Sequence, residues 1–295
     1  MQTDGRGDMI DTVGDEAHHV PARHSRRDPR TARKPQPNRA EEAMEPAQSH
    51  PTAIIHEGAQ LERDVVVGPG SIIYPNVRVA EGTIIEPYCI LGQPRASYYR
   101  DSRFEFPETR IGRDGIIRSH SVIYAGTRCG DSLQTGHRVL IREKSIIGDY
   151  CSVGSNTELH GDVEIGDYSR LHSNTTIAEL SKIGDYVWIF PNVVLANSPH
   201  PPASEFVGAV VEDYAVIAAG AFIFPGVRIG AKALVGAMAL VRQDVAPERV
   251  VVGNPAKDVA SIYQIRNESG EPMYPWTDKV ADYGYPWQRK SRGEI

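Results

Sequence analysis

Residues 147–186 read IGDYCSVGSNTELHGDVEIGDYSRLHSNTTIAELSKIGDY, and an aliphatic residue stands at every sixth position, beginning with Ile147. The same spacing holds over 111–195, where Cys129 and Thr135 depart from the aliphatic pattern. An amphipathic helix repeats its apolar residues every three or four positions and a half-buried strand every two, so neither explains a strict six. A six-residue period is typical of a parallel β-helix, in which each hexad forms one short strand and a turn.

Two columns of residues indicate that three hexads make one coil. In each column the same residue type returns after 18 positions. The first column holds Gly130-Asp131, Gly148-Asp149, Gly166-Asp167 and Gly184-Asp185, and the second holds Asn156, Asn174 and Asn192. Glycine suits a turn that needs an unusual φ, and stacked asparagines can form a hydrogen-bonded ladder. We therefore interpret both columns as structural and expect about nine triangular coils.

Two interruptions divide the repeat into three blocks. Insertions occupy 92–110 and 196–210, and the aliphatic hexads resume after each of them. Because the 18-residue phase is kept on both sides, we expect both insertions to leave the prism at the same corner. Loops that break a rigid repeat in this way commonly carry function.

The sequence predicts an all-β chain with three parts. Residues 1–50 nearly lack aliphatic residues, which predicts a disordered tail. Residues 51–256 should form the parallel β-helix. In the last part, 257–295, a short helix over 258–266 should cap the final coil. Two aromatic segments follow it, Tyr274-Pro275-Trp276 and Tyr285-Pro286-Trp287, and both should pack on the coils or on a neighbouring subunit.

Composition narrows the class of partner. The formal net charge of −6 does not indicate a nucleic-acid partner. No apolar run approaches the roughly 18 residues of a membrane span. The three cysteines form no CxxC pair, which is typical of a reducing compartment. We therefore expect a cytoplasmic protein with neither a nucleic-acid nor a membrane partner.

Three features together resemble the hexapeptide-repeat acyltransferases: the hexads, the 252–257 segment VGNPAK, and the 134–143 segment that begins QTGH. The chain is most similar to bacterial sugar and nucleotide-sugar acetyltransferases of surface-polysaccharide or secondary-metabolite pathways. The resemblance implies a left-handed parallel β-helix, an exception to the usual right-handed crossover. It also implies a homotrimer that binds the acyl donor acetyl-CoA in clefts between subunits.

Acyl transfer needs a base that takes the proton of the attacking amine or hydroxyl, and histidine is the natural choice near neutral pH. His137 lies two residues after a core position, so it should project from a turn, as the catalytic histidine of the resembling family often does. His200 lies in the second insertion, where one branch of that family carries a catalytic His-Pro. The two histidines are rival bases. His160 and His172 directly follow core positions and should be surface residues.

Small and basic residues suggest where a donor could bind. Ala218-Ala219 and Gly236-Ala237 stack 18 positions apart, so the arm of CoA could approach the backbone there. Arg242 and Lys257 could then meet the CoA phosphates. For the acceptor, the predicted substrate contacts are Glu143, Asn156 and Asn174.

We expect an acyl-CoA-dependent acyltransferase that acetylates the amino group of a nucleotide-linked amino sugar. Sugar O-acetylation is the alternative on the enzyme side, and a non-catalytic β-helix scaffold is the alternative from another class. A zinc enzyme with this architecture would need two histidines five residues apart, whereas Arg142 and Ser132 occupy the positions five away from His137. No metal is therefore expected.

Overall fold

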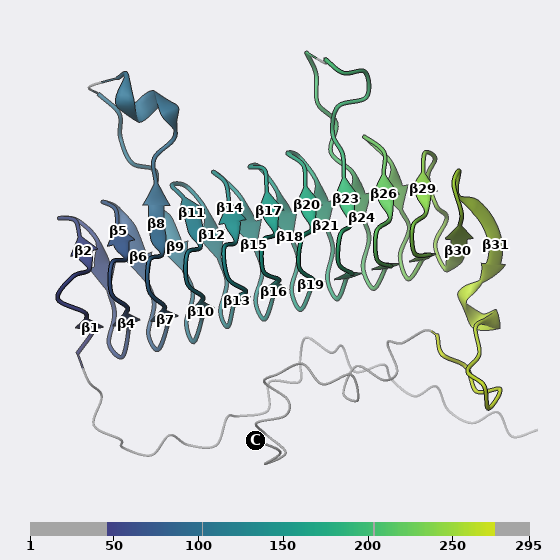
Figure 1. Ribbon diagram of the computed structural model, residues 1–295, viewed down its shortest axis with the longest axis horizontal. Coiled ribbons are helices and arrows are strands. Elements are labelled where there is room, and N and C mark those ends of the chain that lie inside the picture. Colours follow the sequence, from purple (N-terminus) through teal and green to yellow (C-terminus); the bar gives the residue numbers. More distant parts are fainter. Residues whose placement is uncertain (1–45, 102, 203, 275–295) are drawn as a thin grey trace, which may run out of the picture. The chain divides into compact units, whose positions relative to one another are not determined.

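The computed structural model describes residues 46–101, 103–202 and 204–274, and these residues form a parallel β-helix with three sheets (Figure 1). Sheet A consists, in spatial order, of β1 (Gln48–Ser49), β4 (Val66–Val67), β7 (Ile84–Ile85), β10 (Ile116–Ile117), β13 (Gln134–Thr135), β16 (Ser152–Val153), β19 (Arg170–Leu171), β22 (Trp188–Ile189), β25 (Val216–Ile217), β28 (Leu234–Val235), β30 (Arg249–Val252) and β31 (Lys257–Ser261). Sheet B consists of β2 (Ile54–Ile55), β5 (Ile72–Ile73), β8 (Ile90–Gln93), β11 (Val122–Tyr124), β14 (Leu140–Ile141), β17 (Glu158–Leu159), β20 (Thr176–Ile177), β23 (Val194–Leu195), β26 (Phe222–Ile223) and β29 (Leu240–Val241). Sheet C consists of β3 (Gln60–Leu61), β6 (Val77–Val79), β9 (Thr109–Ile111), β12 (Arg128–Cys129), β15 (Ile146–Ile147), β18 (Glu164–Ile165), β21 (Lys182–Ile183), β24 (Val210–Val211) and β27 (Arg228–Ile229).

The core is a stack of the hexad residues that the sequence pattern predicts. Ile147, Val153 and Leu159 are each at most 2% exposed, and they come from sheets C, A and B in turn. The non-aliphatic members Cys129 and Thr135 are buried as well. Fully burying an aliphatic side chain contributes roughly 1.5–3 kcal/mol, so the repeat supplies one such increment per strand. The prediction of an all-β chain built on parallel hexads is confirmed.

The Gly-Asp column has a physical reason that differs from the expected one. Its glycines do not adopt a left-handed φ; that conformation falls two residues later, on Tyr150 (58°) and Tyr168 (59°). A Cβ on Gly130 would lie 2.7 Å from the carbonyl carbon of Gly148 in the next coil. Glycine is therefore required here by the close approach of successive coils.

The same corner is held together between coils by aspartates and tyrosines. The Asp149 carboxylate accepts a hydrogen bond from the amide of Asp131 at 2.8 Å, and the pattern repeats along the column. The rings of Tyr150, Tyr168 and Tyr186 stack with centroids 4.9 and 4.8 Å apart. These contacts fix the rotation of each coil relative to the next.

Both long loops leave the β-helix between sheets B and C, and they rise from the same edge in Figure 1. The first connects β8 to β9 and contains the 3₁₀-helix η2 (Ala96–Tyr99), and the second connects β23 to β24. Pairing continues in phase across each loop, because β7 pairs with β10 and β21 with β24.

The expected C-terminal helix is not formed. Its residues instead make β31, antiparallel to β30, followed by the 3₁₀-helix η3 (Ile262–Gln264). The open edge of sheet A supplies hydrogen-bond partners that a helix would leave unpaired. Arg249 and Asp258 clamp the hairpin through two hydrogen bonds of 2.8 and 2.6 Å.

The described residues also extend the β-helix beyond its expected start. Strand β1 precedes residue 51 and pairs with β4 in the usual register. Most of the expected tail, and the aromatic segments from residue 275 onward, lie outside the described residues. Within the described part of the chain, no helix has the length and apolar character that crossing a membrane requires.

Candidate active site

His137 lies in the turn that joins β13 of sheet A to β14 of sheet B, which we call the A–B corner. Its side chain, 51% exposed, borders a groove of about 370 Å³ on the edge of sheet A. This histidine groove is defined by Arg118, Gly136, His137, Gly154, Arg170 and His172. The predicted outward projection of His137 from a turn is thus found in the structure.

Two glycines form the floor of the histidine groove. Gly136 and Gly154 occupy the position directly after a core residue, where Arg118 and His172 carry long side chains in the coils on either side. A Cβ on Gly136 would lie 2.7 Å from Cα of Ser155. Tight stacking of the coils therefore demands glycine at these positions, and the missing side chains leave the depression.

His137 is held by contacts from both neighbouring coils. Its Nδ1 lies 3.0 Å from Oγ of Ser119, and its amide donates to Oγ of Ser155 at 3.0 Å. Ser119 in turn contacts Glu86, whose Oε2 accepts hydrogen bonds from the Ser119 amide at 3.0 Å and hydroxyl at 3.2 Å. Glu86 Oε2 is 3.9 Å from His137 Nδ1. The imidazole therefore presents Nε2 as the nitrogen not committed to these contacts.

The groove has a cationic and neutral polar lining. Among the described residues that line it there is no aspartate or glutamate, whereas Arg118 and Arg170 border it in separate coils. Arg118 is fixed by donating from Nη1 to the Thr135 carbonyl at 2.6 Å, and the Arg170 guanidinium lies 5.0 Å from the Trp188 ring centroid. Such a lining favours a ligand that carries negative charge.

His172 differs from the expected surface residue. Its ring stacks on Phe190 with centroids 4.8 Å apart, and it lines the groove. Burial lowers the pKa of His172, and the positive charge of the neighbouring Arg170 lowers it further. A neutral imidazole here keeps a polar edge in the groove without adding charge at neutral pH.

His200, the rival base, occupies a different place. It lies in the exposed second loop, which leaves the coil between β23 and β24 at the corner of sheets B and C. The structure therefore places the two predicted bases on different corners of one chain.

The small residues expected to receive CoA share the corner of His137. Ala219 and Ala237 continue the column of His137, in which the other members are Ser119, Ser155, Ser173 and Pro191. Backbone hydrogen bonds of 2.9 to 3.2 Å link this corner strip from coil to coil. Ala219 lies four coils from His137, or roughly 19 Å at about 4.8 Å per coil.

The strip ends near the predicted phosphate-binding residues. A Cβ on Gly236 would lie 2.7 Å from Cγ1 of Val252, and Val252 is the register partner of Lys257. Lys257 and Arg242 line one cavity of about 660 Å³ at this end of the β-helix. The structure thus brings the two predicted cations to one cavity.

The predicted acceptor contacts separate into two groups. Asn156 and Asn174 lie at the A–B corner beside the column of His137, and Nδ2 of Asn156 donates to Oδ1 of Asn174 at 3.1 Å. This bond confirms the asparagine ladder. Glu143 lies near the first loop, where its carboxylate accepts two hydrogen bonds from Arg142. In one chain, Glu143 and His137 are therefore on different corners.

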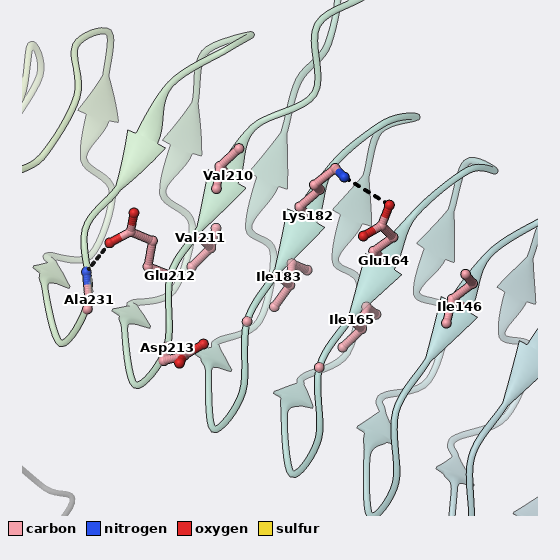
Figure 2. A pocket seen from close by; sticks show the side chains of 12 residues that line it. Ile146, Glu164, Ile165, Lys182, Ile183, Val210, Val211, Glu212, Asp213 and Ala231 are labelled. Atoms are coloured by element: carbon pink, nitrogen blue, oxygen red, sulfur yellow. Dashed lines mark hydrogen bonds and ion pairs between the residues drawn. The ribbon is translucent and has the colours of Figure 1, made fainter.

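A second groove, on the outer face of sheet C, has a volume of about 520 Å³ (Figure 2). This sheet C groove is bordered by Ile146, Glu164, Lys182, Val210 and Glu212. Figure 2 shows the Glu164–Lys182 ion pair across its surface, with an N–O distance of 2.9 Å. It contains no histidine or cysteine among the described residues that line it.

Glu86 and the two arginines of the histidine groove were not expected from the sequence. Glu86 directly follows a core position, as many exposed residues do, and the first insertion shifts its partner coil from 18 to 32 residues away. A search at a spacing of 18 therefore misses the contact with Ser119. Adding the 14-residue offset of the insertion, taken from the register pairs, would have revealed it. Over the described part of the chain, no three His, Cys, Asp or Glu side chains are grouped so as to hold a metal ion.

Comparison with known proteins supports the assignment made from the repeat. The family described as bacterial transferase hexapeptide (six repeats) matches residues 144–179. An acyl-[acyl-carrier-protein]–UDP-N-acetylglucosamine O-acyltransferase of Syntrophobacter fumaroxidans is 34% identical over 131 residues, which cover 37% of this chain and 49% of that protein. A 2,3,4,5-tetrahydropyridine-2,6-dicarboxylate N-acetyltransferase of Staphylococcus aureus is 40% identical over 78 residues, covering 26% of this chain and 32% of that protein. The chain thus spans about half, or less, of the length of these curated relatives.

The fold is also that of a solved relative. The structure of an Arabidopsis UDP-N-acetylglucosamine acyltransferase superimposes with a TM-score of 0.59 at 20% identity, covering 83% of this chain and 77% of that one. At this identity the likeness concerns the fold. With its hexads, its three-sheet coil and these similarities, the chain belongs to the hexapeptide-repeat acyltransferase family.

Proposed function

We propose that this protein transfers an acyl group from acyl-CoA to a nucleotide-linked sugar, with His137 as the general base. The observation that carries the proposal is that His137 borders a polar groove and shares its corner with a strip of small residues. A base must lie within reach of the acceptor, and a donor with a long flexible arm needs a smooth track toward it.

The lining of the histidine groove supports a charged acceptor. Arg118 and Arg170 would attract the diphosphate of a nucleotide-sugar, since guanidinium groups bind phosphate through paired hydrogen bonds. The reacting amine or hydroxyl would then face Nε2 of His137. We place the acceptor as an amino sugar that is N-acetylated in surface-polysaccharide or secondary-metabolite biosynthesis, with O-acylation as the alternative.

The corner strip supports the position of acetyl-CoA. Ala219, Gly236 and Ala237 leave the backbone accessible, and Arg242 with Lys257 would meet the phosphates at the far end. In a homotrimer, a neighbouring subunit would close each corner strip into a cleft. The proposed enzyme would work in the cytoplasm, where acetyl-CoA and nucleotide-sugars are available.

A second donor class follows from one comparison. The Syntrophobacter relative is named for an acyl carrier protein as donor and for O-acylation. The decisive assay therefore offers both donors, acetyl-CoA and an acyl-[acyl-carrier-protein], to matched acceptors that carry an amine or a hydroxyl at the same sugar position. Mass spectrometry identifies the product and the acylated atom.

The expected result is an N-acetylated nucleotide-sugar formed from acetyl-CoA. An O-acyl product, or transfer from the carrier protein alone, would replace the acceptor or the donor in the proposal. No product with any pair, together with an unchanged Tm at saturating CoA, would favour a non-catalytic scaffold. A ligand that binds only the folded state raises Tm, by an amount equivalent to about 2.7 kcal/mol at 100 times Kd.

A further inference from the structure

The contacts of His137 extend through Ser119 to Glu86, and they cross three successive coils. The three residues follow β7, β10 and β13, which are consecutive strands of sheet A. Glu86 Oε2 receives both the amide and the hydroxyl of Ser119, at 3.0 and 3.2 Å. The same hydroxyl oxygen lies 3.0 Å from Nδ1 of His137.

Proton counting decides how this chain of contacts is polarised. A serine hydroxyl has one proton to donate, and an ionised carboxylate can only accept. The Ser119 proton therefore points to Glu86, and the Ser119 oxygen must accept from His137. That requires the proton of the neutral imidazole to sit on Nδ1, so Nε2 keeps its lone pair.

The opposite arrangement is disfavoured by the same geometry. If Ser119 donated to Nδ1, its oxygen would face the carboxylate oxygen at 3.2 Å with no proton between them. The imidazole proton would then sit on Nε2, and this nitrogen could not take a proton from an acceptor. An unpaired acceptor contact of this kind costs more than a typical hydrogen bond stabilises.

We propose that Glu86, acting through Ser119, is a positioning residue that fixes the Nδ1–H tautomer of His137 and so keeps Nε2 available as the base. The inference rests on the proposed role of His137. Glu86 does not touch the reacting atoms; its carboxylate is held by the Ser119 amide, 3.9 Å from the imidazole nitrogen. Protonation of His137 during the reaction would place an imidazolium beside this carboxylate, which stabilises the charge that develops.

The test reads the tautomer directly. Protein labelled with ¹⁵N-histidine is examined by long-range ¹H–¹⁵N NMR, and the His137 signals are assigned by their loss in His137→Gln. The wild-type protein should show the Nδ1–H form. Glu86→Met removes the acceptor and the charge at similar side-chain length, so His137 should shift toward the Nε2–H form. Glu86→Gln keeps an acceptor oxygen and should restore the Nδ1–H signal.

Kinetics provide the second readout. We expect Glu86→Met to lower kcat by about 10- to 100-fold with little change in KM, which is less than the 10²–10⁴ that general-base catalysis supplies. Ser119→Ala should give a similar loss, and Glu86→Gln should recover most of it. Glu158→Gln is the matched control, because Glu158 contacts His160 at 3.1 Å on sheet B, away from the groove.

The outcomes separate this inference from the proposed function. An Nε2–H tautomer in the wild-type protein, or an unchanged tautomer and kcat in a folded Glu86→Met variant, would overturn it. Full activity of His137→Ala with the predicted tautomer shifts intact would overturn the role of His137 as base and leave the hydrogen-bond assignment standing. Tm values of all variants identify those that fail through unfolding.

Discussion

The histidine groove and the sheet C groove are built from the same repeat, yet they differ in almost every chemical respect. The sheet C groove is larger, about 520 against about 370 Å³, but it is bordered by aliphatic side chains and an exposed ion pair. The histidine groove has a histidine held by two neighbouring coils, with arginines in its lining. The difference teaches that in a β-helix the corner, more than the size of a hollow, determines what chemistry is available.

The sharpest way to break this comparison is to remove the histidine. His137→Ala should lower kcat by roughly 10²- to 10⁴-fold, because general-base catalysis is lost, and it should change KM little. Steady-state kinetics on a confirmed donor and acceptor measure this. His160→Ala is the matched control, since His160 also contacts a single carboxylate but lies outside both grooves. Wild-type turnover in His137→Ala with a loss in His200→Ala would transfer the role to the second loop.

Adding one methyl group to each groove should separate stability from activity. A Cβ on Gly136 would lie 2.7 Å from Cα of Ser155, and a Cβ on Gly166 would lie 2.7 Å from the carbonyl carbon of Gly184. Both alanine variants should lose about 1–3 kcal/mol of unfolding free energy through overpacking. Below the transition temperature, Gly136→Ala should also lower kcat/KM, whereas Gly166→Ala should not. Equal kinetic losses in the two variants would remove the distinction between the grooves.

A smaller effect should appear in the pH dependence of stability. Burial, and then Arg170, lowers the pKa of His172 in the folded protein. Below about pH 6.5, the usual value for an unfolded histidine, the unfolded chain binds a proton that the folded chain does not. Stability contributed by neutral His172 is therefore present at neutral pH and lost as the pH falls below that value. His172→Phe, which keeps a ring on Phe190, should show a smaller fall in Tm between pH 7.5 and 5.5.

The smallest effect is expected in the sheet C groove. Lys182→Ala removes the ion pair with Glu164, whose side chains are 59% and 54% exposed. Such exposed pairs contribute about 0–1 kcal/mol, so Tm should move little and kcat/KM should be unchanged. A loss of activity here, with Tm preserved, would show that sheet C takes part in function.

The sequence was most informative where one residue decides one contact. The strict six-residue spacing of Ile147, Val153 and Leu159 predicted both the strands and the buried faces, because each coil offers a single inward position per side. The spacing of 18 predicted the asparagine ladder, and the structure shows the Asn156–Asn174 bond. His137 was identified as the titratable member of its column before its surroundings were known.

The sequence was least informative where two distant segments must be aligned or where competing partners decide. Glu86 escaped notice because the first insertion changes the spacing between its coil and the next. The segment after Val252 resembled a helix, yet the open edge of sheet A offered it strand partners. The Gly-Asp column was recognised, but its cause, close approach of Gly130 to the next coil, needs coordinates.

The path from Glu86 through Ser119 to His137 has a consequence for local opening. Its three members belong to three turns of the solenoid, and such turns contact mainly their immediate neighbours. A transient gap between any two of these turns would separate the members while the rest of the molecule stays folded. Loss of turnover on heating should therefore precede global melting, and amide exchange at Ser119 and His137 should follow the same temperature dependence as the inactivation.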